Sequence, residues 1–343
     1  MAAFDLQFQD YSLMEALAGA GIDAFAVDLL GWGLSSRFII DDPCSASKTQ
    51  QQNFLIPNPL SATCPVPLPF HFTNTFAMRD QFNAVIHDVL SRTGVSQVTL
   101  HGWSLGGAIV ADYVLNGYPE KVKNVIFQAP ALTCATQVPN PIQCWVAPPN
   151  PLPQPGVPIG SMYDRVTASS INWGRQLACS GQRDPAILDP WWGAVRASDP
   201  LASNWGPTDP QTGKPGGLLR APSFDVWGWH PDWVGPDGTL YPATFPELTL
   251  PALFLSGLSD KTVPTATVEA QYNGIGSSTK VLVKISCASH LMMWETSPSA
   301  TRQGGPHKTL RDAAIEWIKS ETYQGATLGT FQVDANGNIT GPF

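Results

Sequence analysis

The sequence predicts an α/β fold in which a mostly parallel sheet is flanked by helices, and two observations lead to this prediction. Short apolar segments alternate along the chain with segments whose apolar residues recur at helical spacing. The alternation stops only between residues 133 and 249 and then resumes, so one long insertion divides an otherwise regular pattern. Strands that alternate with helices imply right-handed crossovers and a parallel sheet that is covered on both faces.

The individual elements follow from local patterns. We expect strands over residues 22–30, 95–101, 122–127, 250–255 and 280–285, and helices over 12–20, 74–92, 105–116 and 307–322. In the helix over 74–92, for example, Phe82 and Ile86 fall on one apolar face. The segment 327–341 predicts a β-hairpin, because its Asn336-Gly337 pair suits the left-handed conformations of a tight turn.

The insertion differs in composition from the rest of the chain. Residues 133–249 hold 19 of the 32 prolines and 8 of the 12 tryptophans. Long regular helices are not expected there, because a proline inside a helix costs about 3 kcal/mol. We therefore expect residues 133–249 to form an irregular cap or lid. The core would comprise residues 1–132 and 250–326, and residues 327–343 would form a C-terminal tail.

Composition also argues against several function classes. Charged residues make up 13% of the 343 residues, whereas about 25% is usual, and the net charge is −8. A negative chain repels phosphate backbones, so we expect no nucleic-acid partner. No apolar run approaches the roughly 20 residues that cross a bilayer, so we expect no membrane span. The sequence gives no signal for the oligomeric state.

Six cysteines bear on the compartment. They have no CxxC spacing and no histidine cluster beside them, so they predict no zinc site. Proximity in the sequence favours three disulfides in an oxidising compartment, and six reduced thiols in a cytosolic protein are the alternative. The expected pairs are Cys44–Cys64, Cys134–Cys144 and, as the remaining pair, Cys179–Cys287. Residues 1–5 nevertheless show neither the basic nor the apolar region of a signal peptide.

The central motif is Gly102-Trp103-Ser104-Leu105-Gly106, a G-x-S-x-G pentapeptide. It follows an expected strand directly and opens a helix of small residues, which is the context of a nucleophile elbow. In such an elbow the serine occupies a strained turn above the carboxyl edge of the sheet. Ser104 is therefore the candidate nucleophile, and the Leu105 backbone N–H can face a developing oxyanion. An ordinary Gly-rich strand–helix turn is the alternative.

A serine hydroxyl needs a base to take its proton, and the base needs a partner that holds it in one tautomer. His290 follows the expected strand over 280–285 and is the candidate base. Asp260 follows the expected strand over 250–255, on the same edge of the sheet, and is the candidate orienting acid. The third expected strand is followed by no carboxylate, which favours Asp260. For both residues, a role as an ordinary loop residue is the alternative.

With these residues the chain resembles the α/β-hydrolase superfamily. The matching features are the elbow at Gly102–Gly107, the turn at Asp28–Ser35, the segment Gly257 to Pro264 around Asp260, and Ser289-His290. They occur in the order Ser, Asp, His that this family uses. The resemblance covers roughly residues 10–132 and 250–322, and it implies that residues 133–249 are the cap. It also implies that Ser104 is the nucleophile, His290 the base and acid, and Asp260 the group that orients His290.

One departure from the family concerns the oxyanion hole. The family normally begins with further strands and a His-Gly loop that supplies a second oxyanion donor, whereas this chain opens inside the helix that follows that loop. We expect either that upstream sequence has been lost, a signal peptide included, or that another segment fills the gap. Losing one donor costs about 10²–10³ in rate. A catalytically impaired binding protein without a complete oxyanion hole is therefore the alternative function.

Aromatic residues indicate what enters the site. Candidate substrate-binding residues are Trp103, Trp191, Trp192, Trp227 and Trp229, and packing inside the insertion is the alternative for each. We therefore predict a secreted or periplasmic serine hydrolase, similar to carboxylic ester hydrolases, that acts on an apolar substrate through an acyl-enzyme. Ester bonds and related carbonyl or C–C bonds remain open as targets. Nothing in the sequence implies a metal or a cofactor.

Overall fold

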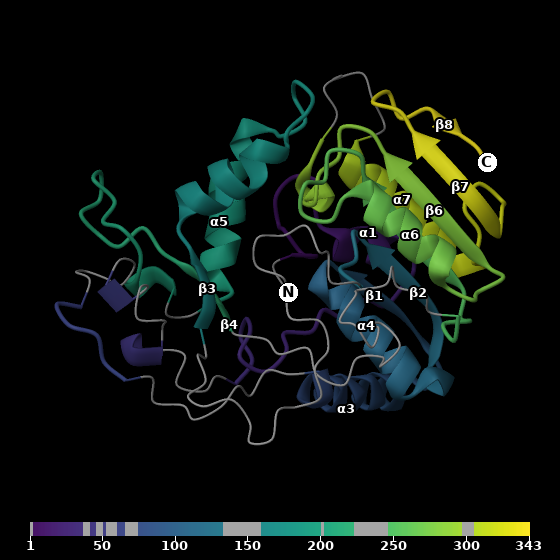
Figure 1. Cartoon of the computed structure of the whole chain (residues 1–343), viewed down its shortest axis with the longest axis horizontal. Coiled ribbons are helices and arrows are strands. Elements are labelled where there is room, and N and C mark those ends of the chain that lie inside the picture. Colours follow the sequence, from purple (N-terminus) through teal and green to yellow (C-terminus); the bar gives the residue numbers. More distant parts are fainter. Residues whose placement is uncertain are drawn as a thin grey trace, which may run out of the picture.

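The computed structural model contains one six-stranded sheet, which follows the predicted α/β pattern (Figure 1). The structure describes residues 3–36, 42–45, 51–52, 60–65, 75–132, 159–199, 202–222, 246–296 and 305–343. In spatial order the strands are β1 (Val98–Trp103), β2 (Val122–Gln128), β5 (Ala252–Gly257), β6 (Lys280–Ile285), β7 (Leu328–Val333) and β8 (Ile339–Thr340). Every neighbouring pair is parallel except β7 and β8, which are antiparallel.

Helices cover both faces of this sheet. Their bounds are α1 (Leu13–Gly19), α3 (Thr75–Thr93), α4 (Leu105–Asn116), α6 (Thr265–Gly274) and α7 (Pro306–Ser320). Alternate residues of a strand point to opposite faces, and two buried clusters result. On one face Leu253 and Val283 pack with α1 and α7, and on the other Phe254 and Leu282 pack with α3, α4 and α6. The predicted fold class is therefore confirmed.

The segment 22–30 is an expected strand that the structure contradicts. Residues 22–29 have no regular secondary structure, and residues 23–27 form no hydrogen bond within the described part of the chain. A strand needs a ladder partner to take up its backbone groups. The segment lines one side of a cavity and β1 lines another, so the two do not pair. The strand prediction for this segment was wrong, because none of the described strands pairs with it.

The described part of the insertion has its own small sheet. It contains the antiparallel strands β3 (Ile159–Tyr163) and β4 (Leu219–Pro222), the π-helix Thr167–Trp173 and the helix α5 (Leu188–Ala197). Figure 1 draws these elements to one side of the main sheet. Short 3₁₀ turns complete the described chain at Pro43–Ser45, Pro119–Lys121, Gly174–Gln176, Pro185–Ile187, Ala202–Asn204 and Met292–Trp294. The helix of ten residues is compatible with the expected lack of long helices.

The C-terminal hairpin is present, and its first strand belongs to the main sheet. β7 pairs with β6 on one side and with β8 on the other. The turn between β7 and β8 is closed by Asp334, which accepts hydrogen bonds from the backbone N–H groups of Asn336 and Asn338. The hairpin therefore extends the sheet beyond β6 instead of standing apart from it as a tail.

Two of the three expected disulfides are present. Cys44 pairs with Cys64 and Cys179 with Cys287, with Cα–Cα distances of 5.4 and 5.5 Å. The second bridge joins the insertion to the loop that follows β6. Cys134 and Cys144, the third expected pair, lie outside the described residues.

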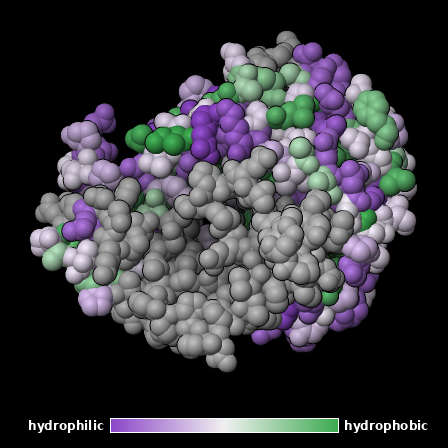
Figure 2. Space-filling model, in the orientation of Figure 1, coloured by the Kyte–Doolittle hydropathy of each residue, from purple (hydrophilic) through white to green (hydrophobic). Residues whose placement is uncertain are grey.

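The surface of the described residues is mixed in polarity. In the view of Figure 2, hydrophobic residues stand in small separate groups among hydrophilic ones. None of the described helices is both long enough and apolar enough to span a bilayer.

Candidate active site

Ser104 lies in a tight turn between β1 and α4. Its φ and ψ are 53° and −123°, a conformation that residues other than glycine seldom adopt. Backbone hydrogen bonds hold the turn: Ser104 N donates to Gln128 O at 3.0 Å, and Ser104 O accepts from Gly107 N and Ala131 N at 2.9 Å. The Ser104 hydroxyl makes no capping bond to α4. The turn therefore fixes the backbone of Ser104 and leaves its hydroxyl free of the helix.

Close packing explains two of the glycines around this serine. A Cβ atom on Gly102 would lie 2.5 Å from Gly106 O, and one on Gly107 would lie 2.7 Å from a Pro130 side-chain atom. Both contacts are too short, so only glycine fits at these two positions. Gly106 differs, because a Cβ atom there would meet no heavy atom within 4 Å. The expected helix–strand packing is thus set by Gly102 and Gly107.

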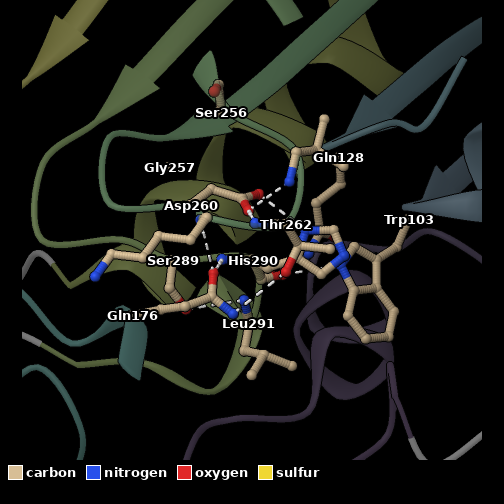
Figure 3. A network of polar contacts seen from close by, with 12 residues as sticks. Trp103, Gln128, Gln176, Ser256, Gly257, Asp260, Thr262, Ser289, His290 and Leu291 are labelled. Atoms are coloured by element: carbon tan, nitrogen blue, oxygen red, sulfur yellow. Dashed lines mark hydrogen bonds and ion pairs between the residues drawn. The ribbon is translucent and has the colours of Figure 1, made fainter. Parts of the chain in front are cut away.

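His290 and Asp260 form a buried pair (Figure 3). Nδ1 of His290 lies 2.8 Å from Oδ2 of Asp260. The other carboxylate oxygen, Oδ1, accepts hydrogen bonds from Thr262 N at 2.7 Å and Val263 N at 2.8 Å. Because a carboxylate only accepts, it places the imidazole proton on Nδ1 and leaves Nε2 as an acceptor. This is the tautomer that a general base needs.

Three parallel strands deliver these side chains to one edge of the sheet. Ser104 follows β1, Asp260 follows β5 and His290 follows β6, so all three stand beyond the carboxyl ends of their strands. Crevices at this edge are where open α/β sheets place their sites. Trp103 joins the serine turn to the histidine loop: its Nε1 donates to His290 O at 2.9 Å, and the two rings lie 5.4 Å apart.

A glutamine of the insertion connects the aspartate and histidine loops. Oε1 of Gln176 accepts from the backbone N–H groups of Lys261 at 3.0 Å and His290 at 3.3 Å. Its Nε2 donates to Asn172 O at 2.8 Å, within the insertion. Gln176 is buried, and Figure 3 shows its amide beside the backbone of His290. Nothing in the sequence singles out Gln176, because a single glutamine in a Pro-rich segment matches no motif.

A buried glutamate supports the same loop from the other side. The carboxylate of Glu295 accepts from Ser289 N at 2.7 Å, from Ser289 Oγ at 2.6 Å and from Trp173 Nε1 at 2.9 Å. Burial raises the pKa of the Glu295 carboxyl, and its hydrogen bonds oppose that shift. Glu295 thus ties the residue before His290 to the insertion. The sequence offers no signal for this role, since Trp173 lies 122 residues away from Glu295.

The tryptophans expected at the substrate lie in different surroundings. Trp103 is half-buried against His290, and its ring contacts Trp294 at 5.9 Å. Trp191 and Trp192 belong to α5 and are each only 5% exposed, within a cluster that includes Trp173. This burial favours packing for both, and substrate contact stays a prediction. Trp227 and Trp229 lie outside the described residues.

The first turn of α4 offers a donor beside the serine. Leu105 is the first residue of this helix, and its N–H therefore has no partner within the helix. The N-terminal end of a helix also carries partial positive charge. The Leu105 N–H is accordingly suited to an oxyanion that forms at Ser104.

Comparison with known proteins agrees with this geometry. Residues 7–166, a little under half of the chain, match the family profile described as serine aminopeptidase, S33. Together with the sheet and the serine turn, this match agrees with the resemblance to the α/β-hydrolase superfamily that the sequence shows. No match was found among curated protein sequences.

Solved structures with a similar backbone are distant in sequence. A monoacylglycerol lipase from Paleococcus ferrophilus shares 15% identity, covers 90% of this chain and 88% of its own, and gives a TM-score of 0.46. A methylesterase from Arabidopsis shares 13% identity over 90% of this chain and 92% of its own, with a TM-score of 0.46. An esterase from a Rhodococcus species shares 15% identity over 92% and 88%, with a TM-score of 0.42.

Proposed function

We propose that this chain is a serine hydrolase that cleaves an ester bond of an apolar substrate through an acyl-enzyme. One observation carries the proposal: a buried His290–Asp260 pair at 2.8 Å stands on the same sheet edge as Ser104. Ser104 is itself held at a positive φ between β1 and α4. A nucleophile, a base and an orienting acid are the minimum set for this chemistry.

In the proposed mechanism each of these groups has one task. Nε2 of His290 removes the proton from the Ser104 hydroxyl while Oγ bonds to the carbonyl carbon of the ester. The carbonyl oxygen becomes an oxyanion and accepts from the Leu105 N–H. When the C–O bond breaks, the imidazolium returns its proton to the alkoxide, which leaves as the alcohol. Water, deprotonated by His290, then attacks the carbonyl carbon of the acyl-enzyme. The bond between this carbon and Ser104 Oγ breaks, the imidazolium returns its proton to Oγ, and the acid is released. Asp260 accepts from Nδ1 throughout and stabilises the imidazolium.

Aromatic residues around His290 support an apolar substrate. Trp103 contacts both His290 and Trp294, and Trp294 contacts Trp173 of the insertion at 5.9 Å. We propose Trp103 as the residue of this group that faces the substrate, with Trp191, Trp192, Trp227 and Trp229 as further candidates. A panel of substrates tests which acyl chain length the enzyme prefers and whether it cleaves an ester or a C–C bond.

The two disulfides support a location outside the reducing cytosol. Bridges of this kind persist in secreted and periplasmic proteins and are rare in the cytosol. We propose a secreted or periplasmic protein on this ground. Mass mapping of peptides from protein purified without reductant tests it: free thiols at Cys179 and Cys287 would contradict the proposal.

The test of the activity is labelling by a fluorophosphonate probe, which reacts with activated serines. We expect the probe to modify Ser104 and p-nitrophenyl butyrate to be hydrolysed, with both signals lost in Ser104→Ala. Ser286→Ala, on the loop after β6, is the matched control and should keep both. A folded chain that neither reacts nor hydrolyses any ester would instead indicate the binding protein that the sequence left as the alternative.

A further inference from the structure

A buried carboxylate lies where the loop that carries His290 meets the insertion. Glu295 is fully buried. Its Oε2 accepts from Ser289 N at 2.7 Å, and its Oε1 accepts from Ser289 Oγ at 2.6 Å and from Trp173 Nε1 at 2.9 Å. The Gln182 side chain of the insertion hydrogen-bonds the same carboxylate. One carboxylate therefore joins the residue directly before His290 to two residues of the insertion.

The donors around Glu295 require two acceptor oxygens. A backbone N–H and an indole N–H can only donate. Each carboxylate oxygen faces one of them, Oε2 the N–H of Ser289 and Oε1 the N–H of Trp173. An ionised carboxylate has two acceptor oxygens, whereas an amide has one oxygen and an NH₂ group that donates. A glutamine at this position would thus set its NH₂ group against an N–H in either orientation.

The insertion also brings a positive charge to this carboxylate. The guanidinium of Arg183 lies over the Trp173 ring, 5.1 Å from its centre, and Nη1 donates to Ser169 O at 2.6 Å. Burial lowers the pKa of Arg183, and the negative charge of Glu295 opposes that shift. A buried charge is costly unless an opposite charge or hydrogen bonds compensate it. Arg183 and the hydrogen bonds both favour the ionised form of Glu295.

Ser289 passes the constraint on to His290. Glu295 holds both the backbone N–H and the hydroxyl of Ser289. The Ser289 hydroxyl in turn accepts from Leu291 N at 3.1 Å. The residues on both sides of His290 are therefore tied to the same buried carboxylate, one directly and the other through a hydroxyl. Movement of Glu295 or loss of its acceptors would displace the backbone of His290.

We propose that Glu295 is the positioning residue of the proposed catalytic base, and that the two acceptor oxygens of its ionised carboxylate fix Ser289, and so His290, against Trp173 of the insertion. This inference rests on the proposed function for the role of His290 as the base. The holding of the loop by Glu295 is independent of that function and is measured separately.

The first test replaces the carboxylate and keeps its shape. Glu295→Gln should lower kcat for p-nitrophenyl butyrate by about a hundredfold with KM nearly unchanged. The reason is that a displacement of about 1 Å at the base costs about this factor, and buried Glu295 does not touch the substrate. Glu15→Gln, on the exposed face of α1, is the matched control and should leave kcat unchanged. Thermal unfolding of each variant checks that it is folded.

A second substitution separates the acceptor role from packing. Trp173→Phe removes the indole N–H that opposes an amide at position 295. The amide can then keep its oxygen for Ser289 N and turn its NH₂ group toward Ser289 Oγ, which can accept. Trp173→Phe alone should lower kcat, but when added to Glu295→Gln it should raise kcat about tenfold relative to E295Q. Substitutions that only disturb packing would instead give losses that add.

Hydrogen exchange gives a readout that does not depend on hydrolysis. The amides of residues 286–291 should exchange at least about tenfold faster in Glu295→Gln, because the Ser289 N–H loses its acceptor. Exchange should slow again when Trp173→Phe is added. A folded wild-type chain that hydrolyses no ester would remove the proposed function, and exchange would then decide by itself whether Glu295 holds the loop.

Three results would overturn the proposal. The first is wild-type kcat and wild-type exchange in Glu295→Gln, and the second is additive losses in the double variant. The third is a raised KM at unchanged kcat, which would place Glu295 at the substrate. If Glu295→Gln does not fold, Trp173→Phe alone decides, because unchanged kcat and unchanged exchange in that variant would equally overturn the proposal.

Discussion

The two ends of the proposed site differ in how firmly the fold holds them. The loops that carry Asp260 and His290 follow β5 and β6, which lie inside the sheet with strands on both sides. The turn that carries Ser104 follows β1, which is the end strand of the sheet formed by the described residues and borders a cavity. The strands before Asp260 and His290 therefore have strand neighbours on both sides, whereas the strand before Ser104 has a described neighbour, β2, on one side.

The insertion adds to this difference. Gln176, Glu295 and the Cys179–Cys287 bridge all connect the histidine loop to other elements. Ser104, in contrast, depends on its own turn and on the hydrogen bonds to Gln128, Gly107 and Ala131. Contacts from the insertion therefore hold the loop that carries His290, the proposed base, in place.

The largest effect is expected at the aspartate. Asp260→Asn keeps the shape of the side chain but changes the tautomer of His290, so kcat for ester hydrolysis should fall by about 10⁴. Steady-state kinetics with p-nitrophenyl butyrate measure this loss. Asp88→Asn, on the exposed face of α3, is the control and should leave kcat unchanged. A loss of tenfold or less in Asp260→Asn would remove Asp260 from its proposed role.

Next in size is the disulfide between the insertion and the histidine loop. Replacing Cys179 and Cys287 by serine removes a bridge between residues that are 108 positions apart and should lower the free energy of unfolding by about 5 kcal/mol. The same change at Cys44 and Cys64, which are 20 residues apart, should cost about 1.5 kcal/mol less. Denaturant unfolding of both variants tests this order. Equal losses would show that loop length does not determine how much stability each disulfide contributes.

The third prediction concerns His101 of β1 and the dependence of stability on pH. Burial lowers the pKa of His101 to about 4 from its ordinary value of 6.5, so the unfolded chain takes up this proton at a higher pH than the folded chain does. Stability from this group is therefore complete above about pH 6.5 and is lost as the pH falls toward 4, by about 3 kcal/mol. Between pH 6.5 and 4 the free energy of unfolding should therefore change less with pH in His101→Gln than in wild type. His87→Gln, on the exposed side of α3, should keep the wild-type slope.

The smallest expected effect on kcat is at Gln176, the glutamine that joins the two loops. Gln176→Ala leaves the N–H groups of Lys261 and His290 without their acceptor, at a cost of about 1–3 kcal/mol per group. We expect kcat to fall about tenfold with little change in KM, because Gln176 positions the base and does not touch the substrate. Gln176→Glu, which keeps an oxygen acceptor, should recover part of kcat, and exposed Gln211→Ala should match wild type. A change in KM alone would contradict a positioning role.

Sequence patterns located most of the fold. The strand over 280–285 and the helix over 105–116 were predicted with the bounds that the structure has. These segments are long, apolar and bounded by clear turn residues, so local pattern determines them. The strand over 22–30 was wrong, because a strand also requires a partner and composition does not reveal one. Helix α6 was missed, since its apolar residues do not gather on one face.

The residues of the candidate site were also predicted only in part from the sequence. Ser104, Asp260 and His290 were found because motif spacing and strand ends are visible in the sequence, and their catalytic roles stay predictions. Gln176 and Glu295 were not found, because their partners lie up to 122 residues away in the chain. Only the folded structure brings such residues together.

The most direct test of the central claim is the mass of the chain during turnover of a slow ester. Rapid acid quenching followed by peptide mass analysis should show the acyl group on the peptide that contains Ser104. The adduct should be absent in Ser104→Ala and should form far more slowly in His290→Gln. An acyl group on any other residue, or hydrolysis at the wild-type rate by Ser104→Ala, would contradict the account.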